Sequence, residues 1–537
     1  MPKIKIEHKD LEKLVGKKIT LKKLEKISPN IKCEWEGEKE GEIALETTHD
    51  RPDLLSTEGI ARSIKNYLGL KKGIQEFKFK KSGLKCTIEK SVSGIRPYSR
   101  MFIVKNVILT DALIQQLMQL QEKIHLSYTT RRKNASIGVY DLDSFEFPIK
   151  YCVKEHINFT PLGEQEPMSA KEILEKTEKG REYADLVTPG KYPLILDKKN
   201  LVLSMPPILN SEETKLKPST KNLFVDVSGE DELLVKKVAV WMATALSERG
   251  EVQTVTMDYM GKQIESPEIQ ENKMQVSTDY VNKMLGTKLT KKEVVELLEK
   301  TGFGTSVSEG KITASIPCYR FDIMHPIDLV EEIAMAYGYN YFEPLMPKVS
   351  TNGRLHPIEK TSGKARSVMI GAGFQEVLTF ILTSKNLVSM KNPDFVELAN
   401  PVSEEHNIVR NTLIPNLLEL ISNNKHHPLP QKIFEVGDIV EKKEVPLTQR
   451  KLAGVIVDSE ATFTEMKSVL EVLSKNLDFK YSLKETNESF FIEGRVGEIK
   501  NKNKTIGTIG EIHPQVLNQL EIEHPTVAFE LNLEKIG

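Results

Sequence analysis

Apolar positions along the chain alternate between strand-like runs and helix-like spacing, which predicts a mixture of β-strands and α-helices. In the segment 113–124, leucine and isoleucine fall at i, i+4, i+7 and i+11, so a helix follows the strand-like run MFIVKNVIL. The stretch SGEDELLVKKVAVWMATALSERG predicts a longer helix, with Ser228 and Asp231 in capping-box spacing and Gly250 as its stop. Four further apolar runs predict strands: IGVYDLD, YPLILD, LVLSMPPIL and NLFVDVS.

Capping and breaking residues predict where other helices begin and end. The segment RPDLLSTEGIARSIKNYLGL predicts a helix started by a proline, because proline is favoured in the first turn, where a missing N–H loses no partner. In residues 268–344, Thr290 and Glu293 form a capping box, Gly302 ends that helix, and HPIDLVEEIAMAYGYNYF predicts a second one. We expect two helices flanking a small hairpin in this part of the chain.

The last third of the chain alternates helices and strands again. Helices are expected near KTSGKARSVMIGAG and TLIPNLLELISNN, strands around FQEVLTF, KIFEVGDIV and KLAGVIV, and a hairpin in GRVGEIKNKNKTIGTIGEI. A lysine-rich stretch marks a first boundary near residue 80. The length of 537 residues suits three or four domains, at about 150 residues each.

Composition narrows the class of protein without identifying a ligand. Lys and Arg number 75 against 76 Asp and Glu, so the net charge of −1 requires neither a nucleic acid nor a membrane. Four widely spaced cysteines fit a reducing compartment, and no apolar run suits a signal peptide or a membrane span, so we expect a cytoplasmic protein. Phosphate-loop, dinucleotide-binding, GxSxG and HExxH motifs are absent, which leaves the common nucleotide-binding and hydrolase classes without support.

The densest group of acids lies in RFDIMHPIDLVEEIA. Asp328, Glu331 and Glu332 fall at i, i+3 and i+4 and therefore project from one side of a helix, with Asp322 just upstream. Oxygen ligands grouped in this way suit Mg²⁺. Acids after a helix-starting proline also stabilise the helix N-terminus, and from the residues alone this second interpretation is the stronger one.

A second candidate is Asp226, at the end of the apolar run NLFVDVS, where strands of α/β domains tend to present functional side chains. Its carboxylate would hold a substrate ammonium group, with Ser204 and Asn210 adding hydroxyl and amide contacts. In the alternative interpretation, which the residues alone favour, Asp226, Ser228 and Asp231 satisfy backbone amides at the start of the following helix. The two prolines between Ser204 and Asn210 likewise favour a rigid turn over ligand contacts.

Two other groups of polar residues have weaker patterns. The run Arg131, Arg132 and Lys133 either neutralises phosphates or belongs to a solvated loop, and the residues favour the loop. His426 and His427 lack companion ligands at metal-binding spacing, so we expect them at the surface.

Six stretches form an ordered series along the chain: TTHDRPDLLSTEGIAR, RRKNASIGVYDLD, LVLSMPPILNSE, IPCYRFDIMHPIDLVEEIAMAYGYN, LANPVSEEHNIVRNTLIPNLL and GRVGEIKNKNKTIGTIGEIHPQVL. Together they resemble segments of the beta subunit of phenylalanyl-tRNA synthetase of the archaeal and eukaryotic-like type. The resemblance runs nearly end to end. Each motif alone is weak, but six in the right order make a chance likeness improbable.

The resemblance implies an α+β multidomain fold. Its parts would be an N-terminal module (1–84), a mixed α/β editing domain that hydrolyses mischarged tRNA (85–267), a small helix-rich, magnesium-associated domain (268–345), and an inactive catalytic-like domain with a class II synthetase-like antiparallel sheet (346–537). It also implies an α₂β₂ heterotetramer that uses ATP to join phenylalanine to tRNA(Phe), with phenylalanine and ATP bound by the alpha subunit. The beta subunit would contribute tRNA contacts, assembly and hydrolysis of misattached tyrosine, without a membrane.

The resemblance also changes the interpretation of both acidic candidates. The Mg²⁺ positions of the family correspond to Asp322, Asp328, Glu331 and Glu332, which now favours a metal there. In the editing domain, Asp226 would accept the amino group of the misattached amino acid, with Ser204, Asn210 and Ser228 as pocket partners.

An internal check concerns the inactive catalytic-like domain. Class II adenylation needs one arginine two residues before a strand glutamate and a second in a late motif, because a guanidinium grips carboxylate and phosphate oxygens bidentately. Here Ile433 precedes Glu435, and no arginine follows Arg495. We therefore expect no aminoacyl-adenylate from this chain alone.

Two rival functions stay open from the sequence. A free-standing hydrolase of mischarged tRNA would be a stable monomer or homodimer and fully active alone. A non-enzymatic RNA-binding scaffold would keep its properties after Asp226→Ala, whereas changes in the basic run 131–133 would weaken RNA binding.

Overall fold

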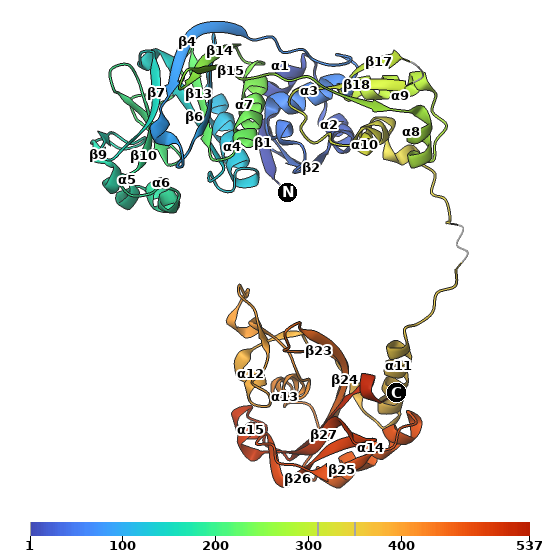
Figure 1. Cartoon of the computed structure of the whole chain (residues 1–537). Coiled ribbons are helices and arrows are strands. Elements are labelled where there is room, and N and C mark those ends of the chain that lie inside the picture. Colours follow the sequence, from blue (N-terminus) through green and yellow to red (C-terminus); the bar gives the residue numbers. More distant parts are fainter. Residues whose placement is uncertain (1, 309–310, 348–350, 537) are drawn as a thin grey trace. The chain divides into compact units, whose positions relative to one another are not determined.

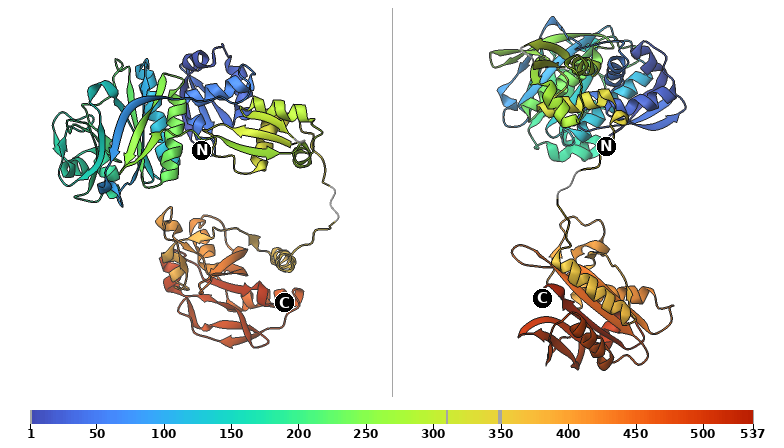
Figure 2. Two further views of the ribbon diagram at one scale, coloured as in Figure 1. Left: turned by 45° about the horizontal axis from the view of Figure 1, so that its top comes forward. Right: turned by 90° about the vertical axis from the view of Figure 1, so that its right-hand side faces the viewer.

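The computed structural model describes residues 2–308, 311–347 and 351–536. The chain divides into two compact units, Met1–Leu345 and Met346–Gly537, which are described separately (Figures 1 and 2). The fold is α+β and contains several separate sheets, as the sequence patterns predict. Within the described ranges, no helix is both long enough and apolar enough to cross a membrane.

The first unit begins with a three-stranded antiparallel sheet in the order β1-β3-β2. Its elements are β1 (Lys3–Glu7), α1 (His8–Val15), α2 (Leu21–Ile27), β2 (Cys33–Lys39), β3 (Glu42–Thr47) and α3 (Thr57–Tyr67). The predicted proline-started helix is wrong at its start, since Pro52–Leu55 forms a separate 3-10 turn. The extended backbone of Ser56 ends that turn, and its hydroxyl accepts the N–H of Gly59 at 3.1 Å, which makes Ser56 the N-cap of α3.

A ten-stranded mixed sheet follows, in the order β12-β11-β10-β7-β4-β14-β5-β13-β6, with β15 paired to β14. Its strands are β4 (Lys80–Ile88), β5 (Tyr98–Lys105), β6 (Ala135–Asp141), β7 (Ile149–Lys154), β10 (Tyr192–Leu196), β11 (Val202–Met205), β12 (Leu209–Asn210), β13 (Leu223–Gly229), β14 (Glu251–Tyr259) and β15 (Lys262–Ser266). A small pair, β8 (Asn158–Phe159) and β9 (Met168–Ser169), precedes α5 (Ala170–Lys176) and α6 (Glu178–Tyr183). The four runs predicted as strands all form strands here.

Helices α4 (Asp111–Ser127) and α7 (Glu232–Leu246) pack on one face of this sheet (Figure 1). The predicted apolar stripe of α4 is confirmed, because Leu117, Leu120 and Ile124 are buried. The predicted capping box of α7 is wrong. Strand β13 continues through Ser228 to pair with β5 and β6, and Asp231 is itself the N-cap, accepting the N–H of Leu234 at 3.0 Å. The helix ends at Leu246, before Gly250.

The rest of the first unit is a three-stranded sheet in the order β16-β18-β17, covered by three helices. Its elements are β16 (Asn272–Val276), α8 (Thr278–Leu285), α9 (Lys291–Lys300), β17 (Gly304–Ser308), β18 (Lys311–Ile316) and α10 (Pro326–Tyr337). The capping box of Thr290 and Glu293 at the start of α9 is confirmed. The prediction of two helices and a hairpin is incomplete, since α8 and the third strand, β16, were not foreseen.

The second unit contains a seven-stranded sheet in the order β19-β23-β24-β28-β27-β26-β25, antiparallel except for the β19–β23 pair. Helices α11 and α14 pack on one face and α13 on the other. Its longer elements are α11 (Pro357–Gly371), α13 (Ile414–Asn423), β23 (Gln431–Glu441), β24 (Leu447–Val457), α14 (Phe463–Asn476), β26 (Phe491–Asn501), β27 (Lys504–Ile512) and β28 (Thr526–Asn532). Its shorter ones are β19 (Gln375–Glu376), β20 (Leu382–Thr383), α12 (Lys385–Ser389), β21 (Val396–Glu397), β22 (Ile408–Val409), β25 (Ser482–Glu485) and α15 (Pro514–Gln519).

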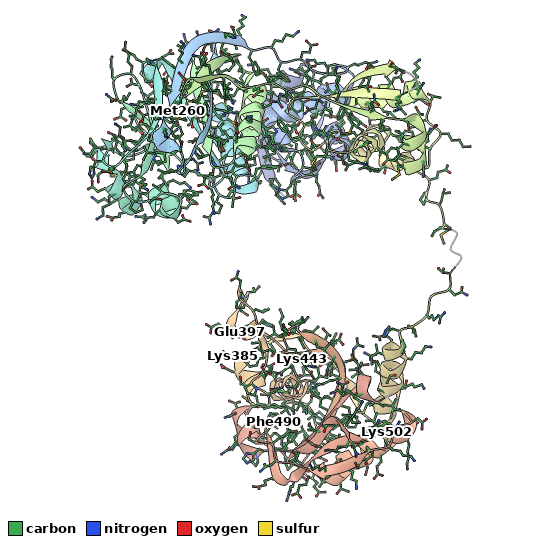
Figure 3. All side chains as sticks on the ribbon, in the orientation of Figure 1. Met260, Lys385, Glu397, Lys443, Phe490 and Lys502 are labelled. Atoms are coloured by element: carbon green, nitrogen blue, oxygen red, sulfur yellow. The ribbon has the colours of Figure 1, made fainter. Side chains whose placement is uncertain are left out.

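Several predictions for this second unit are confirmed. The two expected helices, the strands of KIFEVGDIV and KLAGVIV, and the hairpin of 491–512 are present. The run FQEVLTF contributes only the two-residue strand β19. Figure 3 shows Lys385 and Glu397 on the side of this unit that carries its small sheet β20-β22-β21, where their charged groups lie 3.5 Å apart.

Candidate functional site

A cavity of about 400 Å³ lies where the two end strands of the ten-stranded sheet approach each other. Strand β6 ends the sheet on one side and β12 on the other. The amide of Asn210 in β12 donates to the carbonyl of Val139 in β6 at 3.3 Å, and Asp141 N–H donates to Thr214 O at 3.0 Å. The sheet therefore curls until both of its edges line the same space.

Side chains of α4 form hydrogen bonds with backbone groups on the outer edge of β6, the last strand of the sheet. His125 Nε2 accepts the N–H of Ile137 at 3.0 Å, and Gln121 donates to the carbonyl of the same residue at 3.3 Å. Burial, together with the nearby guanidinium of Arg132, lowers the pKa of His125 to about 3. His125 is therefore neutral, and its Nε2 lone pair is occupied by the backbone.

Asp226 lies on the floor of this cavity. It is the central residue of β13, not the end of the strand, and it faces Gly138 in β6 and Met101 in β5. Only 2% of its surface is exposed. Burial raises the pKa of Asp226 to about 7, against the opposing effects of the Tyr140 hydroxyl, Arg96 and the Ser228 hydroxyl.

Tyr140 holds one oxygen of this carboxylate. Its hydroxyl donates to Asp226 Oδ2 at 2.6 Å and lies 2.8 Å from Ser204 Oγ. Asp226 Oδ1 is buried, and no group in the described part of the chain donates a hydrogen bond of regular geometry to it. Gly138 makes room for this arrangement, because a β-carbon there would overlap both the Tyr140 hydroxyl and Asp226 Oδ2.

Three of the four residues predicted for the pocket line the cavity together: Asp226, Ser204 and Asn210. Ser228 lies beside it, with its hydroxyl 3.5 Å from that of Ser136, a residue of the cavity wall. The alternative interpretation, in which Asp226, Ser228 and Asp231 satisfy backbone amides at the start of the following helix, is confirmed for Asp231, which caps α7. It is wrong for Asp226 and Ser228, because α7 begins beyond them.

The basic run 131–133 divides in the structure. The Arg132 side chain turns inward, lines the cavity, donates to the carbonyl of Ile208 at 2.9 Å and stacks over the Tyr183 ring at 4.4 Å. Arg131 and Lys133 are exposed, as a solvated loop requires. Arg96 fixes this loop from below, donating to the backbone carbonyls of Lys133 at 2.9 Å and Ser228 at 2.6 Å.

The chemistry of the cavity favours a ligand with a hydrogen-bond donor at its deep end. A buried carboxylate with one free oxygen binds an ammonium or hydroxyl group, since leaving that oxygen unpaired is costly. Within the described part of the wall, no serine is hydrogen-bonded to a histidine, so an activated serine nucleophile has no support. Hydrolysis in this cavity would rest on a positioned water molecule.

The second acidic candidate has a different environment, because its carboxylates have partners within the protein. Arg320 Nη2 lies 2.7 Å from Asp322 and 2.6 Å from Glu332. Glu331 lies 3.0 Å from Lys32 of the N-terminal sheet region. Burial raises the pKa of Asp322, but the positive charges of Arg320 and Arg51 outweigh this effect and lower it to about 2.

Asp328 acts as the helix-capping interpretation predicts. Its Oδ2 accepts the backbone N–H groups of Met324 at 2.8 Å and His325 at 2.7 Å, at the start of α10. In the ranges that the structure describes, no three His, Cys, Asp or Glu side chains converge as metal ligands. The four carboxylates fit a metal poorly in this arrangement, because a guanidinium, an ammonium group and the backbone at a helix start already bind them.

Two other predictions concern the second unit. His426 and His427 are exposed, and their rings stack on each other at 4.4 Å, so the surface prediction is confirmed. Glu435 is fully buried and forms an ion pair with Arg410 at 2.8 Å. Arg410 directly follows β22, and nothing in the sequence predicted this pair.

Sequence reasoning missed Tyr140, Gly138 and His125. Tyr140 lies two residues from Gly138 on a strand whose residues are almost all buried, so the alternation that separates a core face from a site face is missing. His125 sits on the apolar side of α4, where a buried histidine is usually structural. No local signal singled out any of these three residues.

The chain is similar to known proteins over its whole length. A model of the "Phenylalanyl tRNA synthetase beta chain CLM domain" matches residues 343–533, and one of the "tRNA synthetase B5 domain" matches residues 274–339. The phenylalanine–tRNA ligase beta subunit of Pyrococcus horikoshii is 40% identical over 556 residues, which cover 100% of both chains. That of Methanocaldococcus jannaschii is 38% identical over 550 residues, covering 99% of this chain and 100% of the relative.

A solved structure gives the same result for the first unit. The crystal structure of an N-terminal fragment of the Pyrococcus horikoshii phenylalanyl-tRNA synthetase beta subunit has a TM-score of 0.61 and 39% identity, covering 63% of this chain and 100% of the fragment. Similarity of this extent, over the full length of several relatives, shows that the chain belongs to the family of phenylalanine–tRNA ligase beta subunits, which are subunits of an aminoacyl-tRNA synthetase.

Proposed function

We propose that this chain assembles with an alpha subunit into an α₂β₂ phenylalanine–tRNA ligase, and that its cavity hydrolyses tyrosine wrongly esterified to tRNA(Phe). The alpha subunit then carries the adenylation site, where ATP activates phenylalanine. The name "beta subunit" of the relatives supports a companion subunit, and the matched domains at 274–339 and 343–533 support a division near residues 268 and 346. Residues 85–267 are the editing domain in this proposal.

A physical argument supports the need for a second, hydrolytic site. Tyrosine differs from phenylalanine by one hydroxyl group, and an apolar pocket rejects an added hydroxyl only modestly, by a factor of about 100. A separate site that hydrolyses the wrong ester removes the errors that binding alone allows. The beta subunit offers such a site, because its cavity combines a polar floor with room for an aminoacyl group.

In this mechanism the cavity binds and orients the ester. Asp226 Oδ1 accepts a hydrogen bond from the amino group of the misattached amino acid, with Ser204, Asn210 and Ser228 as pocket partners. A water molecule attacks the ester carbonyl, and the bond to the ribose oxygen breaks. One proton of this water goes to the ribose oxygen, which leaves as a hydroxyl group, and the other goes to solvent. Tyrosine is released as a carboxylate, so water is the only further reactant.

The observation that carries the proposal is Asp226 Oδ1, which receives no hydrogen bond of regular geometry from the described residues and lies at a cavity of about 400 Å³. A buried polar atom without a partner costs about 1–3 kcal/mol, and a bound donor recovers that cost. The acidic group at α10 offers no comparable oxygen, because its carboxylates have cationic or backbone partners.

The test compares Asp226→Asn with Asp231→Asn in the chain reconstituted with an alpha subunit. Asn keeps the shape of Asp226 and removes its charge, so hydrolysis of tyrosyl-tRNA(Phe) should fall by about 10- to 100-fold, the effect of one charge-assisted hydrogen bond. Asp231→Asn is the matched control, since Asn caps α7 as well as Asp does. Equal hydrolysis by both variants would refute the assignment of Asp226.

Further measurements distinguish the proposed function from its rivals, and the first is phenylalanine-dependent ATP–pyrophosphate exchange. We expect silence from this chain alone, because Ile433 stands two residues before Glu435, and exchange only when an alpha subunit is added. Tyrosyl-tRNA hydrolysis by a stable chain without any partner would favour the free-standing hydrolase. No hydrolysis under any condition, with RNA binding intact, would favour the scaffold.

Magnesium binding by Asp322, Asp328, Glu331 and Glu332 stays a prediction from the resemblance. The helix cap made by Asp328 and the partners of the other three support a structural role instead. Metal content of Asp328→Ala against the unaltered chain tests the assignment, and an unchanged metal content would end it.

A further inference from the structure

Two exposed apolar side chains stand at the opening of the cavity, away from its polar floor. Met118 on α4 has 56% of its surface exposed, and Leu162 has 38% exposed. Both line the same cavity as Asp226. They come from different elements around it: Met118 belongs to the helix that covers β6, and Leu162 is hydrogen-bonded to β12.

Both side chains are held on rigid backbone. Met118 lies one turn before Gln121 and Glu122 on the cavity side of α4. The N–H of Leu162 donates to the carbonyl of Asn210 at 2.9 Å, and the next N–H, of Gly163, donates to Glu212 at 2.8 Å. Secondary structure and hydrogen bonds therefore fix the backbone positions from which the two side chains extend, as in preformed ligand sites.

The cavity therefore changes character from its floor to its opening. The floor carries the Asp226 carboxylate with the Tyr140 and Ser204 hydroxyl groups, and the opening carries two apolar side chains. A ligand that reaches the polar floor through this opening passes both apolar side chains and covers them as it binds. A ligand that fills the cavity from floor to opening combines a hydrogen-bond donor with an apolar group.

We propose that Met118 and Leu162 hold the terminal adenine base of an aminoacyl-tRNA between them, while its aminoacyl group reaches Asp226. The inference rests on the proposed function and assigns the other end of that substrate. In an aminoacyl ester a single ribose joins the amino acid to the base, so the two groups enter one cavity together. A base presents flat π-faces, and both the polarisable sulfur of methionine and an aliphatic side chain pack against them.

The test measures binding of two probes that cannot be hydrolysed. One is 3′-deoxy-3′-tyrosylamino-adenosine, which carries both the amino acid and the base, and the other is tyrosinamide, which lacks the base. The variant Met118→Ala/Leu162→Ala should bind the adenosine probe about tenfold more weakly and tyrosinamide with unchanged affinity. Calorimetry on the full chain reconstituted with an alpha subunit gives both affinities.

Met260→Ala is the matched control. Met260 is exposed to 68%, lies in the turn between β14 and β15, and does not line the cavity (Figure 3). It should bind both probes as the unaltered chain does. A circular dichroism melting curve for each variant shows that the fold is kept.

The outcomes separate this inference from the proposed function. Equal binding of the adenosine probe by the double variant and the control would overturn the inference, and so would an equal loss for both probes. Asp226→Asn should weaken both probes, since each carries the amino group. If Asp226→Asn weakens neither, the proposed function fails at the floor of the cavity, whatever the result at its opening.

Discussion

Replacing Arg320 by methionine tests whether the acidic group of α10 is held by protein cations. Arg320 has 1% of its side chain exposed and lies between Asp322 and Glu332, and its guanidinium stacks over the Phe303 ring at 5.3 Å. Methionine keeps an apolar stem and removes the guanidinium, with its charge, its hydrogen bonds to Asp322 and Glu332 and its contact with that ring. The variant therefore leaves two buried carboxylates without their main partner.

The expected loss of stability follows from that geometry. Removing one member of a buried ion pair costs about 3–5 kcal/mol, because the remaining charge stays buried and unpaired. Lys32 lies 3.9 Å from Glu332 and offsets part of this cost. We therefore expect the lower end of the range, about 3 kcal/mol, for the free energy of unfolding of the first unit.

Tryptophan fluorescence in urea measures this unit alone. The chain has two tryptophans, Trp35 and Trp241, and both lie in the first unit. Trp241 also donates from its ring N–H to the carbonyl of Tyr319 at 3.0 Å, one residue before Arg320. At a slope of about 3 kcal/mol per M, the unfolding midpoint should fall by about 1 M.

The control and the refuting result use the same curves. Lys80→Met breaks a surface pair with Glu251 in the same unit and should leave the midpoint almost unchanged. A fall below about 0.3 M for Arg320→Met would refute the argument, since it corresponds to less than about 1 kcal/mol. A magnesium chloride arm adds a second check: a rise of the unaltered chain's midpoint over its value in EDTA would favour the predicted metal site over the ion pairs.

Two further predictions concern the wall of the cavity. The pKa of His125 is about 3 in the folded chain, below its unfolded value of about 6.5, so only the unfolded chain takes up a proton as the pH falls below 6.5. The difference in stability between the unaltered chain and His125→Gln should therefore shrink by about 1.6 kcal/mol from pH 6.5 to pH 5, and a growing difference would contradict it. Gly138→Ala places a methyl group against Tyr140 and Asp226, so we expect loss of tyrosyl-tRNA hydrolysis together with a stability loss of about 1–3 kcal/mol, both measured on the reconstituted chain; retained hydrolysis would be incompatible with the assigned floor.

Elements with local signals were predictable from the sequence. The capping box of Thr290 and Glu293 involves residues three apart, and the buried stripe of α4 repeats within one helix, so nothing distant decides either. The same rule failed at Ser228 and Asp231. There the spacing is correct for a capping box, but β13 pairs with both β5 and β6 through Gly229, and this pairing keeps Ser228 in the sheet.

Within the site, only the polar side chains at expected strand ends and turns were predictable from the sequence. Asp226, Ser204 and Asn210 were chosen as polar residues at strand ends or turns, and the structure brings them together. Tyr140 and His125 resemble core residues, and their roles arise when the two edges of the sheet meet. The hydrophobic pattern of a 10- or 20-residue segment does not predict that these edges meet, because the contact joins strands β6 and β12, about 70 residues apart.

The two acidic candidates differ most in the groups that surround their carboxylates after folding. Glu331 meets Lys32, 299 residues away in the chain, and Glu332 meets Arg320, so folding supplies the positive charge at α10. One oxygen of Asp226 accepts a hydrogen bond from the Tyr140 hydroxyl. Its other oxygen accepts no hydrogen bond of regular geometry from the described residues. A carboxylate that folding neutralises stabilises the fold, whereas one that folding buries and leaves incomplete needs a ligand to satisfy it. That difference, rather than the density of acids along the chain, separates a structural cluster from a binding site in this protein.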